Sequence, residues 1–508
     1  MANPLHDALI APLRGQDRPL LHLPEGEAIS AGGFAAMCAQ AAGALRALGL
    51  QPGDRVVVQA AKTPAMLAVY GGAVTAGVVF LPLNTAYTPE EVGYFLSDSG
   101  AGLLLTDTAR ASALAPVAAR HGVRIETLGS PPGIAGSFDA MASAQPGECV
   151  AAARGPEDLA ALLYTSGTTG RSKGAMLMQR NLLSNAEVLV EAWRFTADDV
   201  LLHALPIFHT HGLFVATNVS LLAGGSMIFQ PGFDVDAVIG ALPQATAMMG
   251  VPTFYTRLLD DPRLTRDLVA HVRLFVSGSA PLLAETHAAW ESRTGHAVLE
   301  RYGMTETSMI TSNPYEGARR AGTVGFPLPG VEVRVVDAAS GDALPAGETG
   351  IVEVRGPNVF AGYWQMPEKT AEEMRADGFF VTGDLGVIDG QGYLSIVGRQ
   401  KDLIITGGYN VYPKEVELLL DAAPGVKESA VIGVPHPDFG EAVLGVVVPE
   451  PGGMPDLAAV AESLQGRLAR FKQPKALELV EALPRNTMGK VQKAELRRVF
   501  AGRFQAAG

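Results

Sequence analysis

The sequence predicts an α/β protein with a large N-terminal domain, rich in parallel sheets and helices, and a small α+β C-terminal domain. Short apolar runs alternate with longer stretches of helical period before residue 323, which is typical of parallel sheets covered by helices. Short strands between Gly, Pro and Asp turns fill 323–399, and a mixed tail follows. Since 508 residues exceed one typical domain, we expect a core over 1–399, including a β-rich subdomain over 323–399, and a second domain over 400–508.

The individual elements follow from hydrophobic patterning. Buried strands are expected where apolar residues run together between turn residues, and helices where they recur with a period near 3.6. The expected strands are 54–60, 102–107, 159–165 and 272–278, and the expected helices are 34–49 and 181–193. Beyond residue 323, the segments "VEVRVVD", "TGIVEVRG" and "YLSIVGR" are expected to form shorter strands.

Composition excludes several classes of protein. Hydrophobic residues make up 48% and charged residues 18%, which is typical of a chain that builds a core. The net charge of −13 argues against a general nucleic-acid binder. Cys38 and Cys149 lack the spacing of a zinc site. The most apolar stretch, 71–83, is too short to cross a bilayer, and no signal peptide is evident, so we expect a cytoplasmic protein.

The segment "YTSGTTGRSKGAM", residues 164–176, predicts a phosphate-binding loop. It is not a Walker A motif, because Gly167, Gly170 and Lys173 lie three residues apart and Gly follows the Lys. Glycines let backbone N–H groups approach an anion, and hydroxyl and cationic side chains add donors. We expect a flap that closes over phosphates; the alternative interpretation is a Ser/Gly surface linker. The candidate ligands are Thr165, Ser166, Gly167, Thr168, Thr169, Gly170 and Lys173.

Further motifs follow this loop in order. They are "SGSAP" (277–281), "ERYGMTET" (300–307), "VTGDLG" (381–386), "GRQKDLIITGGYNVYPKEVE" (398–417) and "PRNTMGK" (484–490). With the loop, they resemble the motifs of the adenylate-forming superfamily of acyl-CoA synthetases, peptide-synthetase adenylation domains and luciferases. The resemblance covers essentially the whole chain. It implies that a carboxylate attacks the α-phosphate of ATP and expels pyrophosphate, so that the site must neutralise charge and align two anions.

The resemblance assigns roles to individual residues. Glu306, with Thr168, is implied as the Mg²⁺ ligand, although a Glu at this place also suits a helix start. Lys490 is implied to bridge the incoming carboxylate and the α-phosphate; a Lys near a C-terminus is otherwise a solvated surface residue. Asp384 is implied to accept from the ribose hydroxyls, where an isolated turn Asp is usually structural. The remaining implied ATP contacts are Thr305, Ser277, Gly278, Ser279, Ala280, Tyr302, Gly303, Met304 and Arg399.

The C-terminal domain of this superfamily rotates between two half-reactions, which implies a lid over 400–508 with its hinge at Lys401. In the second half-reaction the CoA thiol attacks the acyl-adenylate. Gly407, Gly408 and Lys475 are weak candidates for CoA contacts. Lysines of the "PRNTMGK" motif are acetylation targets in relatives, so a lysine acetyltransferase and a deacetylase acting on Lys490 are candidate partners.

Three residues are candidates for binding the acid. His209 stands where relatives place a gate to the acyl pocket, whereas His211 is expected to be a packed neighbour. Arg257 and Arg301 suit a second carboxylate, because a guanidinium matches carboxylate geometry; the alternatives are a snorkelling edge residue for Arg257 and an ion pair with Glu300 for Arg301.

Five segments together resemble those of malonyl-CoA synthetases, which ligate malonate, and in some cases methylmalonate, to CoA. The segments are "LPIFHTHGLF", "MGVPTFYTRLL", "SGSAPLLAETH", "LERYGMTETSM" and "GVPHPDFGEAV". The expected reaction uses ATP and Mg²⁺ and gives malonyl-CoA, AMP and pyrophosphate through malonyl-AMP. The alternatives are a CoA ligase for another short-chain or branched acid, a stand-alone adenylation domain that loads a carrier protein, and a non-catalytic relative.

Overall fold

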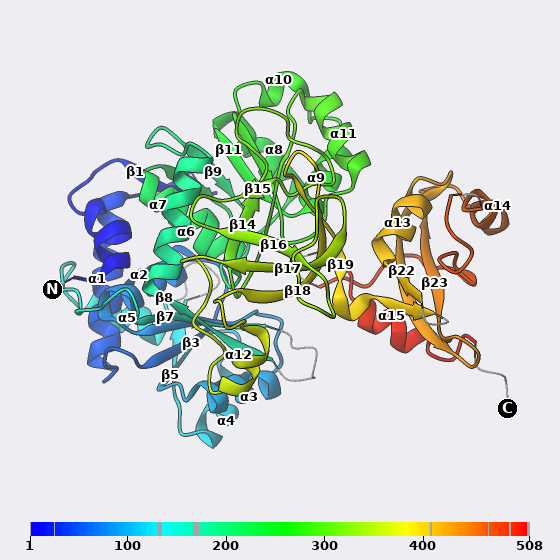
Figure 1. The fold of residues 1–508 in the computed structure, drawn as a ribbon. Coiled ribbons are helices and arrows are strands. Elements are labelled where there is room, and N and C mark those ends of the chain that lie inside the picture. Colours follow the sequence, from blue (N-terminus) through cyan, green and yellow to red (C-terminus); the bar gives the residue numbers. More distant parts are fainter. Residues whose placement is uncertain are drawn as a thin grey trace. The chain divides into compact units, whose positions relative to one another are not determined.

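The computed structural model describes residues 2–24, 26–129, 135–165, 172–406, 409–465, 467–486 and 489–504. The chain divides into two compact units (Figure 1). The first comprises Met1–Ala321, Gly325–Glu332 and Val354–Phe380, and the second comprises Gly322–Val324, Val333–Glu353 and Val381–Gly508. This division follows the packing of the chain. It does not test the domain boundary predicted between residues 399 and 400, which stays a prediction.

Two sheets form the centre of the first unit. A six-stranded sheet has the order β6-β5-β3-β4-β7-β8, and a nine-stranded sheet has the order β15-β14-β13-β12-β11-β9-β10-β1-β2. Their bounds are β1 (Pro19–His22), β2 (Ala28–Ser30), β3 (Arg55–Gln59), β4 (Val79–Pro82), β5 (Leu103–Asp107), β6 (Arg124–Leu128), β7 (Leu159–Thr165), β8 (Lys173–Met178), β9 (Val200–His203), β10 (Ser226–Phe229), β11 (Ala247–Gly250), β12 (Leu274–Ser277), β13 (Leu299–Met304), β14 (Ser308–Ser312) and β15 (Phe326–Pro327).

Most neighbouring strands of these two sheets run parallel, and helices cover them. β3 pairs in parallel with β4 and β5, and β12 does so with β11 and β13. The predicted α/β class and the predicted strands and helices are confirmed. The helices are α1 (Ala31–Ala47), α2 (Pro64–Ala76), α3 (Pro89–Ser99), α4 (Ala111–Arg120), α5 (Ser137–Ser143), α6 (Gln179–Ala192), α7 (Asn218–Ala223), α8 (Val235–Ala241), α9 (Pro252–Leu259), α10 (Arg266–Val269), α11 (Ala284–Thr294) and α12 (Pro367–Glu373).

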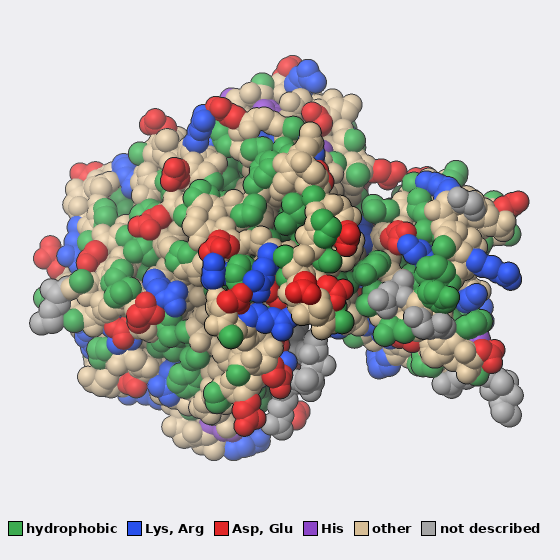
Figure 2. Space-filling model, in the orientation of Figure 1, with side chains coloured by type: hydrophobic (Ala, Val, Ile, Leu, Met, Phe, Trp, Pro, Cys, Tyr) green, Lys and Arg blue, Asp and Glu red, His purple; other side chains and the backbone are tan. Residues whose placement is uncertain are grey.

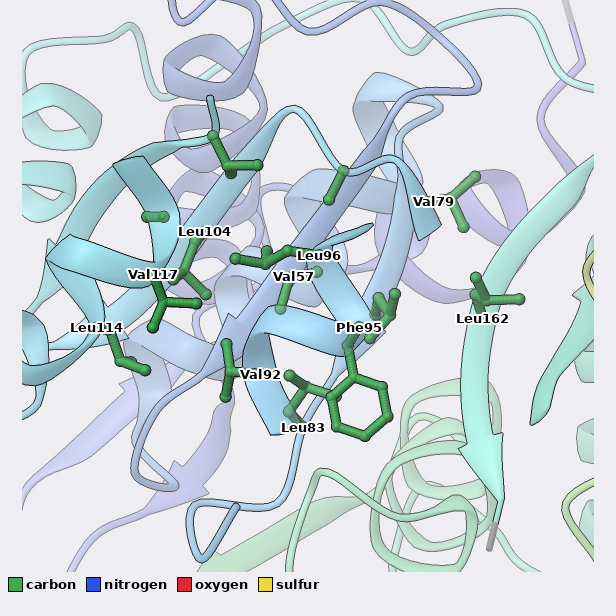
Figure 3. Packing of buried hydrophobic residues seen from close by; sticks show 14 residues of the cluster. Val57, Val79, Leu83, Val92, Phe95, Leu96, Leu104, Leu114, Val117 and Leu162 are labelled. Atoms are coloured by element: carbon green, nitrogen blue, oxygen red, sulfur yellow. The ribbon is translucent and has the colours of Figure 1, made fainter. Parts of the chain in front are cut away.

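One face of the six-stranded sheet shows how the core forms. Val57 and Leu104 from the strands meet Val92, Phe95 and further residues of α3 and α4 (Figure 3). β3 is apolar without alternation because helices bury both faces of a parallel sheet. α3 begins at a capping box formed by Thr88 and Glu91, which satisfies free backbone N–H groups.

The second unit contains two further sheets. A four-stranded sheet has the order β16-β17-β18-β19, and a five-stranded sheet has the order β21-β20-β23-β22, with β24 beside β23. Their bounds are β16 (Glu332–Val336), β17 (Thr349–Arg355), β18 (Phe380–Ile388), β19 (Leu394–Arg399), β20 (Ile404–Thr406), β21 (Tyr409–Val411), β22 (Val426–His436), β23 (Gly440–Pro449) and β24 (Ala476–Leu479). The helices are α13 (Pro413–Asp421), α14 (Leu457–Ser463) and α15 (Lys493–Phe500).

The long hairpin β22–β23 divides the core of the second unit into two clusters. Val431 and Val443 belong to the cluster under α13, and Ile432 and Leu444 belong to the cluster under α15. Successive residues of a strand point to opposite faces, so one apolar hairpin supplies both clusters.

Two surface properties complete the description. Acidic and basic side chains are interspersed over the face of the first unit shown in Figure 2. Among the described residues, the helices are too short or too polar to span a bilayer.

The last residue of α13 gives a stability prediction. Burial raises the pKa of Asp421 from 3.8 to about 6, although Ser429 Oγ donates to its carboxylate over 2.7 Å. Because the folded pKa lies above the unfolded one, the folded state favours the protonated carboxyl, and this contribution is lost as pH rises through about 6. We expect Asp421→Asn to raise the free energy of unfolding at pH 7 by at most about 3 kcal/mol.

Thermal unfolding of the Asp421→Asn protein at about pH 4.5 and at pH 7 tests this expectation. Near pH 4.5 the folded wild-type carboxyl is largely protonated, so the difference between the unfolding temperatures of the two proteins should be clearly smaller than at pH 7. The exposed Asp260→Asn is the matched control. Equal effects of Asp421→Asn at both pH values contradict the prediction.

Candidate functional site

The predicted site residues of the first unit follow the carboxyl ends of strands. Thr165 ends β7, Ser277 ends β12 and Met304 ends β13. β9, β11, β12 and β13 run parallel to one another, so their carboxyl ends meet at one edge of the nine-stranded sheet. Open α/β sheets bind their ligands at this edge, where the loops leave the strands.

Glu306 lies in the turn between β13 and β14 and is 5% exposed. Its Oε1 accepts hydrogen bonds from Thr165 Oγ1 at 3.4 Å and from Tyr363 Oη at 3.1 Å. The carboxylate therefore lies beside the residue that ends β7 and leads into the predicted phosphate loop. A carboxylate and a hydroxyl are hard oxygen donors, which suit Mg²⁺ completed by phosphate oxygens.

Two residues beside Glu306 were not identified from the sequence. Tyr363 and Glu373 belong to the segment "GYWQMPEKTAEE", and Tyr363 Oη also donates to Glu373 Oε2 at 2.7 Å. Lys173, predicted as a phosphate ligand, is buried, with its Nζ 3.2 Å from Glu373 Oε1 and 3.9 Å from the Tyr363 ring centre. The pairing of this segment with β8 brings these side chains together, and the local sequence pattern does not signal it.

Arg301 is a buried cation. It lies on β13, is 4% exposed, and its Nε and Nη2 have no hydrogen-bond partner. Within the described residues no carboxylate forms an ion pair with Arg301, so the structure does not have the alternative pair with Glu300. Burial lowers the pKa of Arg301 below its ordinary value, which reflects the cost of holding the charge away from water.

Gly278 makes room for this guanidinium. A Cβ at Gly278 would lie 2.4 Å from Arg301 Cζ and 2.5 Å from its Nε, distances that real contacts do not reach. The glycine of "SGSAP" therefore has a direct steric role toward Arg301.

Further polar groups lie around Gly278. Ser279 Oγ lies 3.2 Å from His211 Nδ1, while His211 Nε2 and Ser277 Oγ are buried without a hydrogen-bond partner. Burial, followed by the charge of Arg301, lowers the pKa of His211 well below 6.5, so the imidazole is neutral. His211 is buried as the sequence predicts, but its free nitrogen makes it more than a packing residue. This cation with neighbouring donors suits a carboxylate.

The other two acid candidates lie in different surroundings. His209 is half-buried, and its Nδ1 accepts from the His211 backbone N–H at 3.4 Å. Arg257 is exposed in the last turn of α9, whereas Tyr255 of the same helix is buried against β12 through a bond to the Val276 carbonyl. The structure therefore does not give the two predicted arginines a common environment.

Several predicted ATP contacts have defined places in the first unit. Tyr302, Gly303 and Met304 lie at the end of β13, where a bulge shifts the register against β14, and Thr305 follows. Ala280 follows Ser279, which has a φ of 71°. The predicted loop residues Ser166, Gly167, Thr168, Thr169 and Gly170 lie outside the described residues, as do Gly407 and Gly408.

The second unit holds the remaining candidates. Asp384 on β18 is 3% exposed, and its Oδ1 lies 2.5 Å from Arg399 Nε, opposite it on β19. Lys401 follows in a short 3₁₀ turn. Partial burial, then the charge of Arg399, lowers the pKa of Lys490 to about 8, although the residue keeps access to solvent. Lys490 therefore shares an electrostatic environment with the Asp384–Arg399 pair.

Lys475, the weak candidate for CoA, lies apart from this group. It is exposed, and its Nζ lies 5.0 Å from the Phe439 ring centre.

Comparison with known proteins places the chain in a family. The sequence model of the family "AMP-binding enzyme" matches residues 11–364, and that of "AMP-binding enzyme C-terminal domain" matches residues 415–490. A feruloyl-CoA synthase from Amycolatopsis sp is 39% identical over 480 residues, which span 94% of either chain. A malonate–CoA ligase from Arabidopsis thaliana is 36% identical, over 88% of this chain and 78% of the relative.

A solved structure is similar over nearly the whole length. The crystal structure of ATP-bound MatB from Rhodopseudomonas palustris has a TM-score of 0.96 and 54% identity, and the match covers 99% of each chain.

The buried charge of Arg301 leads to a stability prediction. We expect Arg301→Met to raise the free energy of unfolding of the ligand-free protein by about 1–3 kcal/mol, because the apolar side chain removes a buried, incompletely bonded charge. Arg293→Met is the matched control, because the Arg293 guanidinium donates to the carbonyls of Leu264, Leu259 and Asp261, and its loss should destabilise.

Urea unfolding of both variants measures the difference. Destabilisation by Arg301→Met of the same size as by Arg293→Met would show that the Arg301 charge is already well solvated by the protein.

Proposed function

The chain belongs to the family of AMP-binding enzymes, and we propose that it is an AMP-forming acyl-CoA ligase whose acid substrate is malonate. Several relatives that share a third or more of their residues with it are acid–CoA ligases, which supports the reaction class. The observation that carries the choice of malonate is the buried Arg301 guanidinium with two nitrogen atoms left unbonded. A second carboxylate is the ligand that fits it.

In the first half-reaction one carboxylate of malonate attacks the α-phosphate of ATP and pyrophosphate leaves, giving malonyl-AMP. Arg301, with Ser279 and neutral His211, holds the other carboxylate and leaves the reacting one oriented toward the phosphate. The neutral imidazole donates a hydrogen bond through a ring N–H without adding a third charge.

In this proposal Mg²⁺ would be held by Glu306, whose carboxylate accepts from Thr165, and by Thr168, the second ligand that the sequence predicts. When bound, the ion neutralises the charge of the triphosphate and of the leaving pyrophosphate. Thr305 follows β13 next to Glu306 and is placed to contact the α-phosphate in this proposal.

Lys490 stabilises the attacking carboxylate and the α-phosphate in this half-reaction, and Asp384 and Arg399 hold the ribose. In the second half-reaction the C-terminal domain turns at Lys401, and the CoA sulfur attacks the acyl carbon and releases AMP. Gly407, Gly408 and Lys475 are proposed CoA contacts. Acetylation of Lys490 would remove its charge and stop adenylation.

An aromatic acid is the second candidate substrate, because the feruloyl-CoA synthase is also a full-length relative. A pocket for an aromatic acid should be apolar where the acid ends. An acid without a second carboxylate would leave the Arg301 nitrogens unbonded in the complex, and a buried donor left without a partner costs binding energy. Malonate therefore fits the described residues better.

An acid panel tests this proposal. We expect kcat/KM for malonate to exceed that for butyrate, acetate, ferulate and long fatty acids by at least about 10³-fold. Arg301→Ala should remove most of this preference by lowering kcat/KM for malonate, with little effect on butyrate. Exposed Arg263→Ala is the control. Comparable values for malonate and butyrate would contradict the substrate, and absence of ATP–pyrophosphate exchange with any acid would contradict the reaction class.

The pKa of Lys490 leads to a pH prediction. The lysine stabilises charge only when protonated, and its lowered pKa of about 8 means that the ammonium is lost as pH rises through that value. We expect the rate of malonate-dependent pyrophosphate exchange to fall above about pH 8. Lys490→Gln should lose most adenylation at every pH but retain thioester formation from supplied malonyl-AMP. Near-full adenylation by Lys490→Gln rules out the assigned role.

A further inference from the structure

The segment after Phe360 crosses from Glu306 to the strand that follows the Gly-rich loop. The Phe360 backbone N–H donates to the Glu306 carbonyl at 2.8 Å, and the Trp364 N–H donates to the Gly174 carbonyl at 2.7 Å. Between them, the Met176 N–H donates to the Gly362 carbonyl at 3.0 Å. The backbone thus pairs Tyr363 with β8, a few residues after the bond from Phe360 to the predicted metal ligand.

Tyr363 is held firmly from several sides. It is 3% exposed, and its backbone N–H donates to Thr370 Oγ1 at 2.9 Å, in the first half of α12. Its ring packs edge-on against Phe360 and carries the Lys173 ammonium on its face. A hydroxyl on such a ring has a fixed position.

The hydroxyl lies between two carboxylates. Its oxygen is 2.7 Å from Glu373 Oε2 and 3.1 Å from Glu306 Oε1. A phenol carries one proton and donates to one of them at a time.

The two carboxylates are held differently. Glu373 Oε1 is 3.2 Å from Lys173 Nζ and 3.0 Å from Lys369 Nζ, so two ammonium groups hold its charge. The contacts of Glu306 include two hydroxyls, those of Tyr363 and Thr165. A hydroxyl that donates to a carboxylate oxygen fixes the direction of that oxygen without adding a charge of its own.

We propose that Tyr363 is a positioning residue: its hydroxyl fixes the Glu306 carboxylate in the orientation that binds the metal ion accompanying ATP. The inference rests on the proposed function, because the metal belongs to that reaction. Hydrogen-bond partners of metal ligands set the ligand's direction, and their loss costs about 10–100-fold in metal affinity or activity. Glu373 holds the hydroxyl from the other side and carries the ion pairs.

The test is the gain in ATP affinity that Mg²⁺ provides. Isothermal titration with α,β-methylene ATP is run with Mg²⁺ and with EDTA, on wild type and on Tyr363→Phe. We define the gain as the ratio of the affinity with Mg²⁺ to the affinity in EDTA. We expect this ratio to be lower in Tyr363→Phe than in wild type by about tenfold or more. Its affinity in EDTA should stay within about twofold, because the ring that supports Lys173 is kept.

Matched variants separate positioning from folding. Tyr70→Phe removes a buried hydroxyl bonded to Asn218 elsewhere in the first unit and should leave the gain unchanged. Glu373→Gln keeps the volume and leaves a neutral amide oxygen, a weaker acceptor than the carboxylate, so the Tyr363 hydroxyl can still donate to Glu306 and the gain should stay within about twofold of wild type. Tyr363→Met, a second variant without the hydroxyl, replaces Tyr363→Phe if that protein does not fold.

Each outcome has a defined consequence. An unchanged gain in Tyr363→Phe overturns the positioning role, as does an equal loss of affinity with and without Mg²⁺. A loss in Glu373→Gln as large as in Tyr363→Phe also overturns it, since the effect would then not be specific to the Tyr363 hydroxyl. Failure of the wild type to bind the nucleotide with Mg²⁺ contradicts the proposed function itself, and that result is distinct from the others.

Discussion

A guanidinium buried without a full set of partners is the constraint on which the proposed acid end of the site depends. Water solvates a guanidinium well, and a protein interior does so only if it supplies acceptors. The surroundings of Arg301 supply a glycine face, a neutral imidazole and hydroxyls in place of carboxylates. In the free protein, this cost of burying the Arg301 charge lowers the free energy of unfolding. In the proposed function, a ligand that brings a carboxylate would offset this cost, so the missing negative charge would determine which acid binds.

The same strand serves two opposite electrostatic needs. Arg301 lies within β13, and Glu306 lies in the turn just beyond its end. Around Arg301 the described neighbours leave positive charge unbalanced, whereas Glu306 belongs to a group with Glu373, Lys173 and the Tyr363 hydroxyl. In the proposed reaction, an acid and a metal–nucleotide complex would therefore meet near one strand end. The bulge between Tyr302 and Gly303 lies between the two environments.

The sequence predicted the parallel core, and it supplied most of the candidate site residues, because both are encoded locally. Strand and helix periods are properties of neighbouring residues, and each motif is a short run of consecutive residues. Burial was harder to predict: Arg257 and Arg301 look alike as arginines in apolar segments, yet a helix edge leaves the first exposed and a central strand buries the second. Tyr363 and Glu373 escaped notice because their role arises from pairing with β8, almost two hundred residues earlier in the chain.

Overall sequence identity is a weak guide to the acid in this family. The shared motifs act on ATP, which every member uses, so a feruloyl-CoA synthase and a malonate–CoA ligase can both share over a third of their residues with one chain. A few positions in the acid pocket distinguish one acid from another, because the cost of a mismatched acid depends on whether the pocket is apolar or charged. An apolar pocket tolerates a foreign acid at small cost, but a pocket that buries an incompletely bonded guanidinium cannot accept an apolar end without leaving that charge unsatisfied. The environment of Arg301 therefore weighs more in choosing the substrate than a difference of three per cent in identity.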